Sequence, residues 1–161
     1  MHIRKAEKND IENIDKIYTR AKRFMAQHGN PTQWDESYPT MSRVEKDIEQ
    51  EISFVCEENK EIVGVFVLLE GDDPTYKNIE NGKWLDDSEY VTVHRLASSG
   101  EVKGVAKACF DFAKEKCSHV RADTHFDNYV MQSALEKNGF IHTGTIYVCK
   151  DRPSKAYEFV L

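Results

Sequence analysis

The sequence predicts a mixed α/β fold, with a hairpin-rich first half and an alternation of strands and helices in the second half. Two apolar segments, 53–57 and 62–70, are joined by the polar turn 58–61, which is typical of a β-hairpin. Further along, the segment 90–97, rich in β-branched residues, leads through a short loop into apolar residues at helical spacing. The chain has 161 residues, so we expect residues 1–161 to fold as a single domain.

The first half also contains a short strand and two helices. The strand covers residues 2–6, and Asn9-Asp10-Ile11-Glu12 then has the form of a capping box, which predicts the start of a helix. Gly29-Asn30-Pro31 ends this helix, and residues 32–41 follow with no clear period. Ser42-Arg43-Val44-Glu45 is a second capping box, which predicts where the other helix begins.

The second half is expected to continue as strand, helix, strand, helix and two strands. One helix follows Gly104, and Asp127-Asn128 caps the next, which Asn138-Gly139 ends. The inward residues of this later helix are expected to be Val130, Met131, Ala134 and Leu135. The strands are expected at 90–97, 120–124, 141–149 and 156–161. The complete order is β-α-α-β-β-β-α-β-α-β-β.

Composition and charge exclude several classes of protein. The net charge of −6 argues against a general binder of nucleic acid or anionic membranes, since both normally carry a basic excess, and it mildly favours cationic substrates such as amines. No segment approaches the length of a membrane span, and the N-terminus lacks the apolar core of a signal peptide. The cysteines have neither CxxC nor zinc-finger spacing. We therefore expect a cytoplasmic protein without a metal, either a monomer or a homodimer.

The turn from the strand 90–97 into the helix after Gly104 is a candidate phosphate cradle. A loop that enters a helix offers backbone N–H groups without partners, and the helix dipole adds partial positive charge there. Small residues let a phosphate approach that backbone. An ordinary strand-to-helix loop also uses glycine for turning, so the loop by itself leaves both interpretations open.

The wider arrangement resembles the GNAT superfamily of acetyltransferases over nearly the whole chain. The residues that carry the resemblance are the run from His94 to Ala106, Asn128 at a helix start, and Lys137-Asn138-Gly139-Phe140 at the end of that helix. The resemblance implies the acyl-CoA N-acyltransferase fold, with a central, mostly antiparallel, splayed sheet flanked by helices. It also implies acetyl-CoA as co-substrate, its pyrophosphate bound by backbone amides of a Gln/Arg-x-x-Gly-x-Gly/Ala loop.

The loop pattern of the family falls on this chain in one of two registers. By the usual spacing from Leu96 it covers residues 103–108, where Lys103 replaces Gln/Arg and Ala106 replaces the central Gly. The alternative, residues 101–106, keeps the Gly but starts with an acid. We favour the first, because the helical periodicity begins at Ala106. The residues implied to bind the cofactor are Leu96, Ala97, Ser98, Lys103, Gly104, Val105, Ala106, Lys107 and Asn128.

The reaction that the resemblance implies is direct attack of an amine on the acetyl thioester. A free alkylamine has a pKa of about 10 and is mostly protonated at neutral pH, so the reaction needs either a base, acting directly or through water, or a site that binds the neutral amine. The two candidates for the base are His94, on the strand before the cofactor loop, and His125, just past the strand 120–124. Many members carry a Tyr in the last turn of the later helix, where it protonates the departing thiolate. Leu135 occupies that position here. The thiolate is then protonated by water or by another group, or catalysis rests mainly on positioning of the reactants.

Other side chains admit both a structural and a functional interpretation. Gln33, Trp34 and Tyr38 lie where the family builds its acceptor pocket, and they either line that pocket or cover the edge of the sheet. The run 121–125 resembles a local signature of one bacterial GNAT subgroup, in which we interpret Arg121 as part of a structural network.

The resulting prediction is an acetyl-CoA-dependent N-acetyltransferase that acts on a primary amine of a small molecule, an amino-acid derivative or a peptide. The alternative is a non-catalytic sensor of coenzyme A or acyl-CoA with the same fold.

Overall fold

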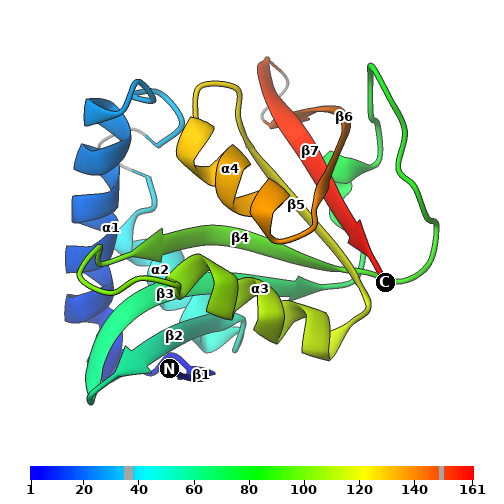
Figure 1. Ribbon diagram of the computed structural model, residues 1–161. Helices are drawn as coiled ribbons and strands as arrows, with labels where there is room; N and C mark the ends of the chain where they lie inside the picture. Colours follow the sequence, from blue (N-terminus) through cyan, green and yellow to red (C-terminus); the bar gives the residue numbers. More distant parts are fainter. Residues whose placement is uncertain (35–37, 149–150) are drawn as a thin grey trace.

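The computed structural model describes residues 1–34, 38–148 and 151–161, and within them it forms a seven-stranded sheet flanked by helices (Figure 1). The strand order is β1-β2-β3-β4-β5-β7-β6. The strands are β1 (His2–Lys5), β2 (Ser53–Glu58), β3 (Glu61–Glu70), β4 (Val91–Ser98), β5 (His119–His125), β6 (Ile141–Val148) and β7 (Arg152–Val160). The helices are α1 (Ile11–Gln27), α2 (Met41–Glu49), α3 (Val105–Lys116) and α4 (Tyr129–Lys137). This order confirms the predicted one, with short 3-10 turns added at Lys8–Asp10 and Pro74–Tyr76.

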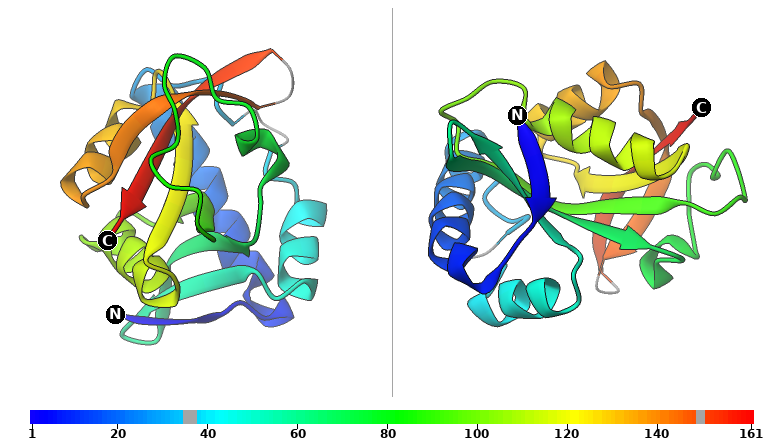
Figure 2. Two further views of the ribbon diagram at one scale, coloured as in Figure 1. Left: turned by 90° about the vertical axis from the view of Figure 1, so that its right-hand side faces the viewer. Right: turned by 90° about the horizontal axis from the view of Figure 1, so that it is seen from below.

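Helices cover both faces of the sheet. The α3 and α4 helices pack on one face, and α1 and α2 lie on the other (Figure 1; Figure 2). Because successive side chains of a strand point to opposite faces, β3 contributes to both apolar cores: Phe66 is buried in the cluster under α3, and Val65 in the cluster under α1 and α2. The sheet is therefore buried on both sides, and functional groups must reach a cavity through its edges or gaps.

Such a gap opens between β4 and β5. These two strands run parallel, and their register consists of Val91↔Val120 and Thr92↔Arg121, after which they diverge. The other neighbouring strands in the described sheet pair antiparallel over longer registers. The predicted splayed and mostly antiparallel sheet is thus confirmed.

A β-bulge lies on β4 beside this gap. On β3, Val65 pairs with Ala97 and Val67 pairs with His94, so that two residues of β4, Arg95 and Leu96, lie opposite one residue of β3. Arg95 adopts a φ of 48°, which is uncommon for a residue with a side chain. A bulge leaves an extra residue outside the ladder, and here it does so at the edge of the gap.

Both predicted capping boxes are wrong in position. The turn before α1 is closed by the Asp10 carboxylate, which accepts from the Glu7 N–H at 2.7 Å and is also paired with Arg4, so Asn9–Glu12 is not a box. The N-cap of α2 is Thr40, whose hydroxyl accepts from the Arg43 N–H at 3.0 Å. Thr and Ser are comparable caps, and the earlier residue takes the position.

Other differences concern element ends and one helix face. The last strand begins at Arg152 rather than at 156, because it already pairs with Val148 of β6 there. Val130 is 50% exposed rather than inward, whereas Leu135 is buried as expected. Cys149, the end of one predicted strand, lies outside the described residues. Within the described ranges, no helix combines the length and the apolar character that crossing a membrane requires.

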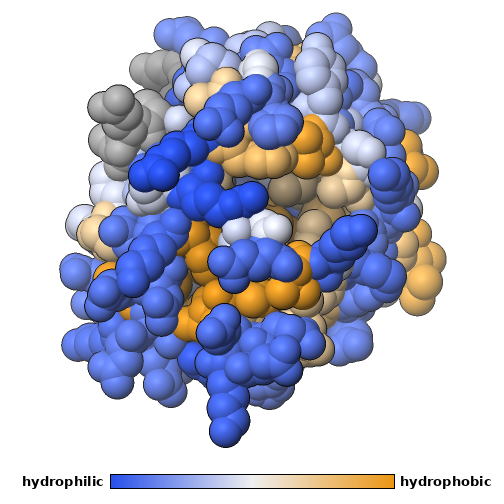
Figure 3. Space-filling model, turned by 60° about the vertical axis from the view of Figure 1, so that its left-hand side comes forward, coloured by the Kyte–Doolittle hydropathy of each residue, from blue (hydrophilic) through white to orange (hydrophobic). Residues whose placement is uncertain are grey.

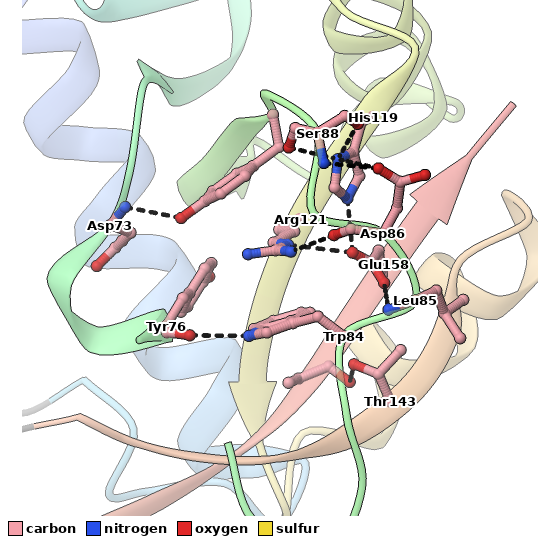
Figure 4. Close-up of polar contacts among 12 residues, drawn as sticks. Asp73, Tyr76, Trp84, Leu85, Asp86, Ser88, His119, Arg121, Thr143 and Glu158 are labelled. Atoms are coloured by element: carbon pink, nitrogen blue, oxygen red, sulfur yellow. Dashed lines mark hydrogen bonds and ion pairs between the residues drawn. The ribbon is translucent and has the colours of Figure 1, made fainter. Parts of the chain in front are cut away.

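The segment 71–90, between β3 and β4, is fastened to β5 and β7 by a buried polar network (Figure 4). The Glu158 carboxylate accepts hydrogen bonds from His119 Nε2 at 2.5 Å, from Arg121 Nε at 3.1 Å and from the Leu85 N–H at 2.5 Å. The Arg121 guanidinium also lies 4.1 Å from the ring centre of Trp84, a favourable cation–π distance. The structure therefore places Arg121 in a packing network, as interpreted from the sequence, and this network fixes a segment that contributes to the site.

Candidate active site

A cavity of about 940 Å³ occupies the gap between β4 and β5. Its walls come from both diverging strands, from the connection between α1 and α2, and from the segment 71–90. Figure 3 shows a hollow on one face of the molecule, with apolar residues inside and hydrophilic residues around it. The predicted residues that line the cavity are Gln33, Trp34, Tyr38, His94, Leu96, His125 and Asn128. The fold thus brings together both candidate bases and the whole predicted acceptor set.

His94 is held between two carboxyl groups. Its Nε2 lies 2.7 Å from Asp73 Oδ2, and its Nδ1 lies 3.9 Å from Asp123 Oδ1. Burial alone would raise the pKa of Asp73, but hydrogen bonds from His94 and Thr75 outweigh it and lower the pKa to about 2. Asp73 is therefore ionised at neutral pH and can only accept, so the Nε2 of His94 carries the proton. The lone pair of Nδ1 remains free to accept another proton.

Asp123 is itself positioned by two hydroxyl groups. Tyr76 Oη donates to Asp123 Oδ1 at 2.6 Å, and Ser154 Oγ donates to Oδ2 at 2.8 Å. Burial raises the pKa of Tyr76 well above its usual value, which keeps its hydroxyl a donor. The second carboxyl group beside His94 is therefore fixed by hydrogen bonds from two other segments of the chain.

Sequence reasoning did not identify Asp73, Tyr76 or Ser154. Asp73 lies in the turn sequence Asp72-Asp73-Pro74, and its side chain caps the 3-10 turn, accepting from the Thr75 N–H at 2.9 Å. A turn aspartate gives no sign that it meets a histidine on the following strand. Asp123 lies within the run 121–125, which carries no local sign of a contact with His94.

His125 differs from His94 in its hydrogen bonds. Its Nδ1 accepts from the Asp127 N–H at 3.0 Å, and because a backbone N–H can only donate, Nδ1 is unprotonated. The proton of the neutral ring then lies on Nε2, which is 3.4 Å from Thr32 Oγ1. The ring closes the turn between β5 and α4, and its Nδ1 lone pair is already occupied by the hydrogen bond from the Asp127 N–H. The two histidines that the sequence presented as equal candidates are thus separated by geometry.

Tyr38 and Arg95 link the acceptor side of the cavity to the bulge. Arg95 Nη1 donates to Tyr38 Oη at 3.1 Å, and Nη2 pairs with Asp47 at 2.9 Å. Burial raises the pKa of Asp47, and the Arg95 guanidinium opposes that rise. Tyr18 Oη donates to the Arg95 carbonyl at 2.8 Å. These contacts hold Arg95 in its left-handed conformation.

Gln33 and Trp34 both line the cavity and fasten the chain around it. Gln33 Oε1 accepts from Asn30 and from Asn128, each at 2.9 Å. Trp34 is 8% exposed and packs edge-on against Tyr18, with ring centres 5.5 Å apart. The two interpretations of these residues, pocket wall and cover, are therefore compatible.

Comparison with known proteins gives structural matches. No family model and no curated protein sequence matches the chain. An acetyltransferase of the GNAT family from Streptococcus agalactiae 2603 is 28% identical, with a TM-score of 0.91, over 99% of this chain and 95% of that one. A chain from Staphylococcus aureus Mu50 is 25% identical, with a TM-score of 0.71, over 98% and 97%. Arabidopsis thaliana Naa50 shares the fold at 13% identity and a TM-score of 0.63, over 99% and 98%.

The chain belongs to the GNAT superfamily. Of its predicted cofactor residues, Ser98 and Ala106 are partly buried and Lys103 is exposed, and four others form two groups. Leu96 and Asn128 line the cavity, although Asn128 already caps α4 through the Met131 N–H at 3.0 Å and donates to Gln33. Ala97 and Val105 are 4% and 2% exposed, so only their backbone groups are available to a ligand.

The loop before α3 ends in an open turn at Gly104. Gly104 is the N-cap of α3, with a φ of 85° and nothing within 4 Å of the place where a Cβ would be. The helix begins at Val105, and the Ala108 N–H donates to the Gly104 carbonyl at 3.0 Å. The open turn and the N–H groups of the first helical turn fit a phosphate-bearing ligand. Lys107, in the first turn of α3, is exposed and paired with Asp111.

Leu135 is 1% exposed and lines the cavity. At this position α4 therefore presents an aliphatic side chain to the cavity. Among the described residues, no group of three or more His, Cys, Asp or Glu side chains is arranged to hold a metal ion.

Proposed function

We propose that this protein is an acetyl-CoA-dependent N-acetyltransferase that acetylates a primary amine of a small molecule, an amino-acid derivative or a peptide, with His94 as the general base. The observation that carries the proposal is the pair formed by His94 and the ionised Asp73 in the gap between β4 and β5. Membership of the GNAT superfamily supports acetyl transfer, and the paired histidine supports an amine as acceptor, because an amine must lose a proton to react.

The proposed role of His94 follows from the state of its two nitrogens. An alkylamine with a pKa near ~10 is mostly protonated at neutral pH, so a base is required before or during its attack. Nδ1 of His94 has the free lone pair, and Asp73 holds the proton on Nε2 and stabilises the positive charge that the ring gains. Asp73 is thus a positioning residue, and His94 is the residue that accepts the proton.

Acetyl-CoA fits the start of α3 together with two apolar residues of the cavity wall. The open Gly104 turn and the first turn of α3 would hold its pyrophosphate through backbone N–H groups, and Leu96 and Leu135 would contact its apolar arm. When bound, acetyl-CoA supplies an acetyl thioester. The bulge at Arg95 and Leu96 provides backbone groups outside the ladder beside the gap, where an N–H would stabilise negative charge on a carbonyl oxygen. Naa50, which was solved with the bisubstrate analogue CoA-Ac-MVNAL, supports this use of the fold.

The experiment that tests the function measures release of free thiol from acetyl-CoA with a panel of primary amines. The proposal expects amine-dependent thiol release and thermal stabilisation of the protein by acetyl-CoA, because a ligand that binds the folded state raises its stability. Thermal stabilisation by acetyl-CoA without thiol release for any amine would contradict an enzymatic function and favour a coenzyme A sensor. Absence of both would overturn the cofactor as well.

A further inference from the structure

The charged side chains of the cavity do not follow the charge of the whole chain. The protein has a net charge of −6, whereas Arg43, Arg95, Arg152, Asp73 and Asp123 line the cavity. Because Asp47 pairs with Arg95, two guanidinium groups remain against two carboxylates, so the cavity wall lacks the acidic excess of the whole chain. Net charge therefore does not predict what this cavity accepts.

The three arginines are not equivalent. Arg95 is neutralised by Asp47, whose two oxygens lie 2.9 and 3.1 Å from its nitrogens. Arg152 is exposed and donates to the backbone carbonyls of Thr32 and Gln33, which carry no net charge. Arg152 thus keeps a positive charge that no carboxylate within the described residues balances through an ion pair.

Arg43 is the second uncompensated cation. It lies on α2, is exposed, and lines the cavity. It adds to the positive field at Asp47, but both oxygens of Asp47 are already held by Arg95. Within the described part of the chain, its guanidinium forms no ion pair or hydrogen bond.

The two carboxylates of the cavity wall lie beside His94 and are mostly shielded from solvent, whereas Arg43 and Arg152 are exposed. The side chains of Asp73 and Asp123 are 9% and 13% exposed and flank His94. The wall also includes apolar side chains such as Trp34, Leu69 and Val93. The cavity thus combines shielded carboxylates beside His94, apolar wall residues and two exposed arginines that no carboxylate among the described residues pairs with.

We propose that the acceptor amine also bears an anionic group, a carboxylate or a phosphate, which Arg43 and Arg152 bind while the amine lies beside His94. This inference rests on the proposed function and narrows it to one class of acceptor. Guanidinium groups bind both anions through charge-assisted hydrogen bonds, often in pairs. A polyamine suits the cavity poorly, because its distal charges would meet the two arginines.

The test compares acceptors in matched pairs, with thiol release from acetyl-CoA as the readout. Glycine, β-alanine and 4-aminobutyrate are paired with methylamine, ethylamine and propylamine, phosphoethanolamine with ethanolamine, and spermidine serves as the polycation. We expect kcat/KM to be at least about tenfold higher for the anionic member of a pair, the ratio expected from one favourable charged contact. The carboxylate and phosphate pairs distinguish the two anions.

Variants then assign the effect to the arginines. Arg43→Gln and Arg152→Gln should each raise KM for the preferred anionic acceptor about tenfold and leave its kcat within about twofold. The kcat and KM for the matched neutral amine should not change. Lys46→Gln is the control, because Lys46 is exposed on the same helix and does not line the cavity. The KM values for acetyl-CoA and the thermal midpoints show whether each variant remains folded and binds its co-substrate.

Two results separate the inference from the proposed function. Thiol release that is equal or faster with neutral amines or spermidine, or an equal effect of the arginine variants on all amines, would overturn the anionic acceptor and leave the acetyltransferase intact. Absence of thiol release with every amine would overturn the proposed function and this inference with it.

Discussion

Replacement of Asp73 by Asn tests whether this carboxylate is held ionised by its neighbours. The pKa of Asp73 falls from its usual 3.8 to about 2 in the folded protein, and each pKa unit corresponds to about 1.36 kcal/mol. Because its side chain is only 9% exposed, the ionised form stabilises the fold by about 2 kcal/mol at neutral pH. We expect Asp73→Asn to lower the free energy of unfolding by about that amount at pH 7.

The pH dependence gives this prediction its sign. A carboxyl group whose pKa is depressed by folding contributes stability above its unfolded pKa, near ~4, and loses it as the pH falls through its folded pKa, about 2. Urea denaturation at several pH values should therefore show the wild type and Asp73→Asn converging between about pH 4 and pH 2. Asp72→Asn, a change at the exposed neighbouring residue, should follow the wild type. A constant difference between wild type and Asp73→Asn across this range would refute the reasoning.

Three further substitutions give separate expectations. His125→Gln should leave kcat within about threefold of the wild type in the thiol-release assay, since His125 closes a turn with both ring nitrogens engaged; a large loss would make it a catalytic residue. Arg121→Met should lower the free energy of unfolding in urea by about 3–5 kcal/mol, because it leaves the buried Glu158 carboxylate without its guanidinium partner; a change below about 1 kcal/mol would contradict that network. Gly104→Ala should cost about 1–2 kcal/mol from its left-handed conformation alone, and unchanged stability would show that the turn relaxes.

The order of helices and strands could be predicted because short-range sequence patterns determine it. The β2–β3 hairpin is an example: its turn residues Asn59 and Lys60 take φ values of 51° and 68°, the conformation that two-residue hairpin turns require, and apolar strands flank it. The caps were harder. Thr40 and Ser42 are both good N-caps, and only the folded chain shows which hydroxyl meets the helix.

The site could be predicted only in part, because its parts meet through long-range contacts. His94 was found from its place before the cofactor loop. Asp73, which sets its protonation state, lies in a polar segment without a period, and that segment is positioned by Glu158, 73 residues beyond Leu85 in the sequence. The bulge at Arg95 carries no glycine or other local signal, and tertiary contacts with Tyr18 and Asp47 hold it.

The account depends most directly on His94 as the base, which a comparison of His94→Gln with wild type tests. We expect kcat for amine-dependent thiol release to fall by about 10²–10⁴-fold, the usual contribution of general base catalysis. Thermal stabilisation by acetyl-CoA should remain as in the wild type, because the side chain of His94 contacts Asp73 and Asp123 rather than the loop before α3. A His94→Gln variant that keeps the turnover of the wild type would contradict the central claim.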